Sequence, residues 1–139
     1  MVRDTRQLTH AEYLRLAMRH RFCLVAPGDF TSTHKITEAV ALGAAGGCVP
    51  VLVLPGKPKD VGTQVAHMLP YARWLDWCEI AYLVPESEAA GGMAAVLRQL
   101  ESLSKEEVEQ KRRALRRVRD AFGARYVRDV IVMRSSSAG

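Results

Sequence analysis

A run of residues between positions 28 and 35 combines groups that bind phosphate in many proteins. It holds a glycine, which lets a ligand approach the backbone closely, then hydroxyl side chains, and then a lysine. The hydroxyl groups come where a helix is expected to begin, and a helix start offers unpaired N–H groups and the positive end of the helix dipole. The sequence therefore predicts an anion-binding pocket in this segment. Its candidate residues are Gly28, Asp29, Ser32, Thr33, His34 and Lys35.

The elements around this segment explain how it would be positioned. Apolar runs cover Phe22–Ala26 and Val49–Leu54, and their shortness suits strands that are buried on both faces. Between them, Ser32 or Thr33 can cap a helix, and Glu38 falls in its early turns. A strand, a helix and a second strand make a βαβ unit with parallel strands. The candidate pocket then lies at the carboxyl end of the first strand, where open parallel sheets bind ligands.

Each candidate side chain also has a purely structural explanation, which the sequence leaves open. Asp29 can hydrogen-bond its own turn instead of orienting a basic residue. Ser32 and Thr33 can serve only as helix caps. Lys35 and Glu38 can be ordinary residues of a solvated helix surface.

The rest of the chain predicts one further strand and several helices that cover the sheet. The third strand is expected at Ile80–Val84. The helices are expected at Thr9–Arg19, Val61–Leu69, Glu88–Glu101 and from Ser104 to Phe122. At 139 residues the chain has the length of one domain, placed at residues 1–134 with a core at 21–122 and a disordered tail at 135–139.

Composition and charge exclude several classes of protein. Hydrophobic content of 48% and charged content of 25% are ordinary for a globular domain, and no apolar run approaches the roughly 20 residues that span a bilayer. The first residues lack the apolar segment of a secretory signal. The net charge of +5 arises from 20 Lys and Arg against 15 Asp and Glu, and much of the excess falls within Lys111–Arg119. A solvated helix face explains this excess, so no nucleic acid is expected as a partner.

The cysteines, Cys23, Cys48 and Cys78, are too widely spaced for a zinc site, and no metal is expected. Cys23 and Cys48 fall in the expected core strands, where buried thiols are expected rather than a disulfide. Adjacent parallel strands could nevertheless bring these two side chains together.

The order of these segments resembles a known family. The sequence FCLVAPGDFTSTHKITEAVALG, followed by CVPVLVL, resembles the nucleotide-sugar-binding half of exostosin-like glycosyltransferases. That family shows a strand ending F-C-L-x-P-x-G, a turn with Ser/Thr and Arg, a helix with [E/D]-A-I-x-x-G and a C-I/V-P-V strand. The later segment LPYARWLDW resembles the family's L-P-F-x-x-x-L-D-W. The resemblance runs from about Arg21 to Val84 and continues more loosely to Phe122.

The resemblance implies both a fold and an activity. The expected fold is a three-layer, Rossmann-like α/β domain with a small parallel sheet, similar to the carboxyl-terminal half of a GT-B glycosyltransferase. The implied reaction is an inverting transfer from a nucleotide sugar, such as a UDP-sugar, to a glycan acceptor, with no tightly bound cofactor. Family members hold the donor between two such halves and work in the Golgi lumen. A general base is therefore expected on an amino-terminal half or a partner chain, and this chain is expected to be an incomplete piece that binds donor weakly on its own.

A different function remains open beside this one, because fold alone does not fix activity. The chain could be a non-catalytic α/β module that binds a nucleotide or acts as a scaffold.

The resemblance also gives roles to individual residues. Glu38 stands where the family's helix carboxylate accepts hydrogen bonds from the ribose hydroxyls, and two carboxylate oxygens can accept both donors of a vicinal diol. His34 and Lys35 stand where the family offers arginine to the diphosphate, so positive charge is retained without the planar fork of arginine. The chain departs from the pattern at residues 44–47, where the extra residues either lengthen the helix by about one turn or form a loop.

Two later segments could also matter for binding. The loop Pro55–Asp60 follows the second strand and could reach the same ligand. Trp74 and Trp77 are expected to pack under this loop, with sugar stacking as the alternative. Asp76 is expected to cap a helix rather than to carry a hydrogen bond in a site.

Overall fold

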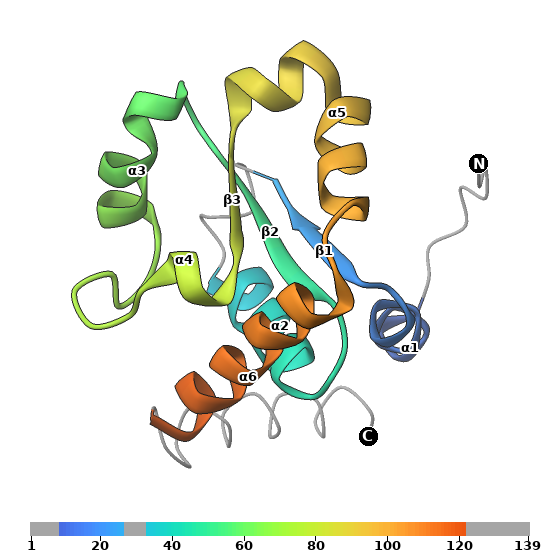
Figure 1. Ribbon diagram of the computed structural model, residues 1–139. Helices are drawn as coiled ribbons and strands as arrows, with labels where there is room; N and C mark the ends of the chain where they lie inside the picture. Colours follow the sequence, from blue (N-terminus) through green and yellow to red (C-terminus); the bar gives the residue numbers. More distant parts are fainter. Residues whose placement is uncertain (1–8, 27–32, 122–139) are drawn as a thin grey trace.

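The computed structural model describes residues 9–26 and 33–121, and within them the chain forms an α/β fold (Figure 1). The strands of this part form one parallel sheet in the order β1-β2-β3, which confirms the predicted fold class. The described elements are α1 (His10–Arg19), β1 (Phe22–Val25), α2 (Thr33–Ala44), β2 (Val49–Leu54), the 3-10 turn η2 (Pro58–Asp60), α3 (Val61–Met68), α4 (Trp77–Ile80), β3 (Tyr82–Pro85), α5 (Glu86–Glu101) and α6 (Lys105–Ala121).

Strand β2 is the centre of the described sheet, and all its residues are buried. β1 lies parallel to it on one side, with Phe22 opposite Val49, and β3 lies parallel on the other, with Leu54 opposite Pro85. β1 is an outer strand of the described sheet, and its Leu24 side chain is 57% exposed whereas its Val25 is buried. The predicted βαβ unit of β1, α2 and β2 is confirmed, with its two strands side by side.

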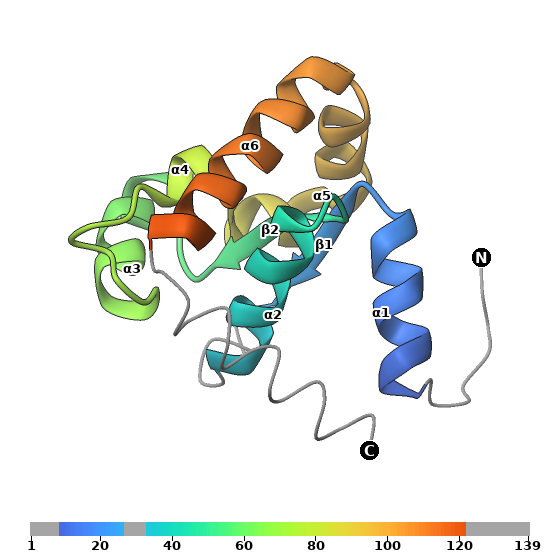
Figure 2. The same ribbon diagram turned by 90° about the horizontal axis from the view of Figure 1, so that it is seen from below.

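Val51 and Leu52, which are neighbours in β2, belong to two different apolar clusters. Leu52 and Leu54 pack with residues of α2 and α6, whereas Val51 packs with Val96 and Leu100 of α5. This alternation follows from the strand geometry, which points successive side chains to opposite faces of the sheet. Helices therefore cover both faces and give the three-layer arrangement that Figures 1 and 2 show from two sides.

The third strand begins two residues later than predicted, because the chain first forms the short helix α4. Asp76 Oδ1 accepts a hydrogen bond from the backbone N–H of Cys78 at 3.0 Å, which caps this helix as expected. Ile80, predicted as the first strand residue, is instead the last residue of α4 and is fully buried. Helix α5 begins earlier than predicted, at Glu86, and its backbone leaves the helical conformation at Gly92.

The extra residues 44–47 form the end of α2. The N–H of Gly47 donates to the carbonyl of Leu42 at 2.8 Å, and the N–H of Gly46 donates to that of Gly43 at 3.1 Å. Gly46 has a φ of 93°, the left-handed conformation that ends a helix in a Schellman motif. The insertion therefore closes α2 in an ordered way and leads directly into β2.

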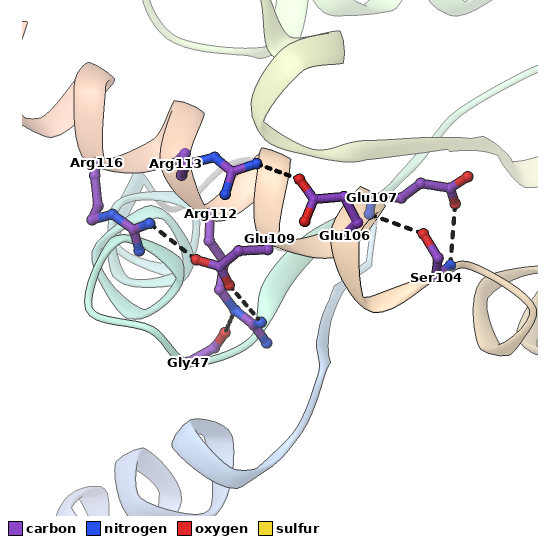
Figure 3. Close-up of polar contacts among 8 residues, drawn as sticks. All are labelled: Gly47, Ser104, Glu106, Glu107, Glu109, Arg112, Arg113 and Arg116. Carbon is purple, nitrogen blue, oxygen red and sulfur yellow. Dashed lines mark hydrogen bonds and ion pairs between the residues drawn. The ribbon is translucent and has the colours of Figure 1, made fainter.

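Helix α6 begins with a capping box and buries one face. Ser104 Oγ accepts from the N–H of Glu107 at 3.1 Å, and Glu107 Oε2 accepts from the N–H of Ser104 at 3.3 Å (Figure 3). Val108 and Leu115 are buried against the core, as predicted for a helix that covers the domain.

The outer face of α6 carries ion pairs within the helix, which fits the prediction of a solvated charged face. Arg113 pairs with Glu106 at 2.7 Å. Arg112 and Arg116 both contact Glu109, at 3.3 and 3.0 Å (Figure 3). Part of the positive charge of this segment is therefore offset by its own carboxylates.

The prediction of free thiols in the first two strands is wrong, because Cys23 and Cys48 form a disulfide. Cys23 lies in β1, and Cys48 immediately precedes β2. Their Cα atoms are 5.2 Å apart, within the range that a disulfide spans, because neighbouring strands lie about 4.8 Å apart. Cys78 is a free cysteine and is exposed.

Candidate functional site

The carboxyl ends of the strands lie at one edge of the sheet, as the candidate pocket requires. Leu54 and Pro85, the last residues of β2 and β3, are register partners. The loops that follow them are joined, since the N–H of Ser87 donates to the carbonyl of Gly56 at 3.1 Å. In Figure 1 this edge is the upper one, where the chain passes from β2 towards α3 and from β3 into α5. In the chain, helix α2 comes after the carboxyl end of β1.

The predicted site residues divide into three groups. Gly28, Asp29 and Ser32 lie outside the described residues. Thr33, His34 and Lys35 are the first residues of α2. Their backbone N–H groups are therefore among those that a helix leaves without an internal partner, and they lie at the positive end of its dipole. The anion-binding geometry expected of a helix start is present in the backbone.

Glu38, the remaining predicted residue, lies in the second turn of α2. Its side chain is half-buried. Atom Oε1 is buried and has no hydrogen-bond partner among residues 9–26 and 33–121. A buried acceptor without a partner costs roughly 1–3 kcal/mol, so such atoms are rare in folded proteins. Glu38 is thus placed to accept hydrogen bonds.

The loop after β2 brings two lysines to the same edge of the sheet. Gly56 has a φ of 92°, and a Cβ there would meet the Asp60 side chain. Asp60 Oδ2 accepts from the N–H of Lys57 at 2.9 Å, which fixes the turn. Lys57 and Lys59 are exposed. Sequence reasoning named this loop but gave its lysines no role, although their position directly after a strand end was a usable signal.

The two tryptophans of the later segment have opposite surroundings. Trp77 is 2% exposed, and its Nε1–H donates to the carbonyl of Pro70 at 3.0 Å. The expected packing role is therefore confirmed for this residue. Trp74 is 81% exposed, so the same expectation is wrong for Trp74.

A cavity of about 580 Å³ lies away from the candidate pocket, between α4, α6 and the first residue of β3. Lys111 lies over the ring of Tyr82, and its Nζ donates to the carbonyl of Cys78 at 2.6 Å. Burial lowers the pKa of Lys111. Burial, followed by the negative charge of Glu107, raises the pKa of Tyr82. This cavity lies at the amino ends of the strands, so it is separate from the predicted phosphate site.

In the part of the chain that the structure describes, no His, Cys, Asp and Glu side chains gather in a group of three that could hold a metal ion. None of the helices described combines the length and the apolar composition that crossing a membrane requires.

Comparisons with known proteins test the resemblance that the sequence suggested. Residues 2–100 match the family of the exostosin GT47 domain. Neither curated proteins nor solved structures provide a significant match. The matched region includes β1, α2, β2 and β3, which carry the candidate pocket and the motifs of the resemblance. Because this match covers well over half of the chain, the protein belongs to the exostosin GT47 family of glycosyltransferases.

Proposed function

We propose that this chain is the donor-binding part of an exostosin glycosyltransferase and holds a nucleoside diphosphate sugar, a UDP-sugar by family analogy, at the start of α2. The observation that carries the proposal is the buried, unpartnered Oε1 atom of Glu38. A ribose offers two neighbouring hydroxyl donors, and a carboxylate has the acceptors to bind both.

The spacing along α2 supports binding of the diphosphate at its first turn and of the ribose at its second turn. Glu38 lies five residues after Thr33, which corresponds to roughly 7–8 Å along a helix axis. The diphosphate would lie at the helix start, where the backbone N–H groups and the positive charge of Lys35 can offset its negative charge. The ribose would lie one turn further along, against Glu38.

The chemistry proposed for these residues is binding and stabilisation of the leaving group. In an inverting transfer the acceptor hydroxyl displaces the nucleoside diphosphate in one step, and negative charge builds up on the departing phosphate. The start of α2 would stabilise that charge without reorganising. The general base that takes the proton of the acceptor would come from an amino-terminal GT-B domain or from a partner chain.

The disulfide supports a location in the secretory pathway. Disulfides persist in oxidising compartments and are rare in reducing ones. The Cys23–Cys48 bond is consistent with work in the Golgi lumen, the location that we propose by analogy with the family.

Calorimetric titration with UDP, using the chain and its variant Glu38→Gln, tests the proposal. The unmodified chain should bind UDP, and the variant should bind roughly tenfold more weakly, because a charged acceptor of hydroxyl hydrogen bonds is lost. Glu101→Gln is the matched control, because Glu101 is exposed at the carboxyl end of α5. This variant should leave the affinity for UDP unchanged. The free energy of unfolding of Glu38→Gln should not fall, because Oε1 of Glu38 makes no hydrogen bond within the described residues that the variant would break. Absence of UDP binding, or equal binding by Glu38→Gln, would contradict the donor site.

A further inference from the structure

The turn between α3 and α4, residues 69–76, displays a large aromatic side chain to solvent. Trp74 is 81% exposed, although its neighbour in the motif, Trp77, is buried. Exposure of an indole ring is unfavourable in water, and tryptophan is enriched where proteins bind other molecules. The exposed ring has no packing role in the described structure and offers its face to a ligand.

The backbone of this turn is fixed by several contacts. The carbonyl of Tyr71 accepts hydrogen bonds from the N–H groups of Trp74 at 3.0 Å and Leu75 at 2.9 Å. Tyr71 has a φ of 57°, a left-handed conformation that is unfavourable for a residue with a side chain. The bond from Trp77 Nε1 to the carbonyl of Pro70 holds the start of the turn against its end. Such strain persists where the surroundings hold it and is concentrated at ligand sites.

A cavity of about 420 Å³ lies beside the exposed ring. Val65, Leu75 and Trp77 supply apolar lining, and Arg73 and Asp76 supply polar groups of opposite charge. The hollow is open to solvent, and its mixture of aromatic, aliphatic and few polar side chains suits a ligand that rests against the surface. The opposite charges balance, so the site does not select a strongly anionic ligand such as a nucleotide.

A pyranose ring fits these features. When its hydroxyls are equatorial, both of its faces present C–H groups with small positive charge, which are attracted to the negative face of an indole. Its hydroxyls both donate and accept hydrogen bonds, so a guanidinium and a carboxylate can bind them together. We propose that Trp74, Arg73 and Asp76 form a subsite for a neutral glycan with equatorial hydroxyls, and this inference rests on the proposed glycosyltransferase function.

The position of this glycan subsite relative to the donor segment indicates which substrate it binds. The turn precedes α4 and the first residue of β3, whereas the donor segment lies at the carboxyl ends of the strands. In Figure 1 the turn is at the lower left beside α4, and the start of α2 also lies below the upper edge of the sheet. The subsite would therefore bind a sugar of the acceptor glycan and not the nucleotide of the donor.

Intrinsic fluorescence offers a direct test, because the chain contains only the two tryptophans and Trp77 is buried. Titration with cellotetraose, a β-linked glucan whose hydroxyls are equatorial, should shift the emission of Trp74 to shorter wavelength. Sorbitol carries similar hydroxyls without a flat ring and should cause no shift.

Substitutions of Trp74 test whether cellotetraose binds at this turn. By calorimetry, Trp74→Ala should weaken cellotetraose binding at least tenfold, whereas Trp74→Phe should stay within about threefold, since it keeps an aromatic face. Leu97→Ala on α5 is the control, because Leu97 is also an exposed apolar residue, at 47%, and it should leave binding unchanged. Equal binding by Trp74→Ala and the unmodified chain, or equal responses to sorbitol and cellotetraose, would overturn the subsite. A Trp74-dependent dimer that does not bind cellotetraose would do the same and would identify the surface as a contact between copies.

The two proposals fail separately in these experiments. Glu38→Gln should bind cellotetraose as the unmodified chain does, and Trp74→Ala should bind UDP as the unmodified chain does. Loss of UDP binding by Trp74→Ala would show that the turn acts through the donor site and would overturn the separate subsite. Glycan binding without UDP binding would contradict the donor site and leave a carbohydrate-binding module.

Discussion

Lys111 lies over the aromatic ring of Tyr82, with Nζ 4.5 Å from the ring centroid. The contact joins α6 to the first residue of β3 and combines a cation–π interaction with the hydrogen bond from Lys111 to the carbonyl of Cys78. Both ionisable groups are partly buried, and burial moves their pKa values in opposite directions, down for Lys111 and up for Tyr82.

The first prediction concerns the pH dependence of stability that Lys111 produces. Its pKa is lower in the folded protein than in the unfolded chain, so the unfolded chain binds more protons between the two values. The unfavourable burial of the charge is therefore fully present at neutral pH and is relieved as the pH rises from the lowered pKa towards the ordinary value of 10.5. Relative to Lys111→Met, the unmodified protein should gain stability on going from pH 7 to pH 9.5.

Urea unfolding at the two pH values measures this gain. Both proteins should carry Cys78→Ser, so that the exposed free thiol cannot attack the disulfide at alkaline pH. The raised pKa of Tyr82 acts in the opposite direction, since its stabilising effect is lost only as the pH rises above about 10, so the comparison ends below that value. A stability difference that stays constant with pH would contradict the prediction.

The second prediction concerns the disulfide. Cys23 and Cys48 are 25 residues apart, and closing a loop of this length in the unfolded chain corresponds to about 3.5 kcal/mol. The double variant Cys23→Ala/Cys48→Ala should lose about this much free energy of unfolding in urea. Cys78→Ser should change it by less than about 0.5 kcal/mol, because Cys78 is exposed. Alkylation followed by mass spectrometry should label one cysteine before reduction and all 3 afterwards, and any other count would disprove the pairing.

The third prediction compares two glycines that both have room for a Cβ atom but differ in backbone conformation. A Cβ added at Gly46 or at Gly62 would meet no atom within 4 Å, but only Gly46 has a positive φ. Gly46→Ala should therefore lower the free energy of unfolding by about 1 kcal/mol, because the end of α2 requires the left-handed conformation. Gly62→Ala, in the first turn of α3, should raise it by roughly 0.5 kcal/mol. Changes of the same sign in thermal unfolding would contradict the assigned conformations.

The fourth prediction compares two arginines of α6. The Nε–H of Arg112 donates to the carbonyl of Gly47 at 2.9 Å and so ties α6 to the chain that enters β2 (Figure 3). Arg112→Ala should cost about 1–2 kcal/mol, because it leaves that carbonyl without this charged donor. Arg113 contacts Glu106 on the exposed surface, and Arg113→Ala should cost less than about 0.5 kcal/mol. Equal losses in chemical denaturation would show that the bond to Gly47 contributes nothing specific.

The sequence predicted the sheet because short apolar runs and a helix between them leave few possible arrangements. The strand β2 begins and ends as expected, and α2 begins at Thr33, close to the predicted start of this helix. The prediction for the cysteines was wrong because their pairing is decided by tertiary structure. The pairing of Cys23 with Cys48 depends on the register of two strands, and a sequence pattern does not specify that register.

The candidate site was predictable in kind but not in detail. That Glu38 belongs to an early turn of a helix follows from the sequence, but the burial of its Oε1 atom depends on how that helix packs. Trp74 and Trp77 belong to one motif, and their separation into an exposed and a buried ring results from the turn at Tyr71. A left-handed tyrosine has no signal in the sequence, because glycine and asparagine are the usual residues there.

The cross-link between Cys23 and Cys48 also restricts how β1 can misalign with β2. Moving β1 by one residue along β2 would turn the buried Val25 towards the other face of the sheet and would bring the exposed Leu24 inward. The covalent bond blocks that slippage, since it anchors β1 next to the residue that leads into β2. Chains produced in a reducing cytoplasm lack this anchor, so correct alignment of their first strand depends on side-chain packing alone.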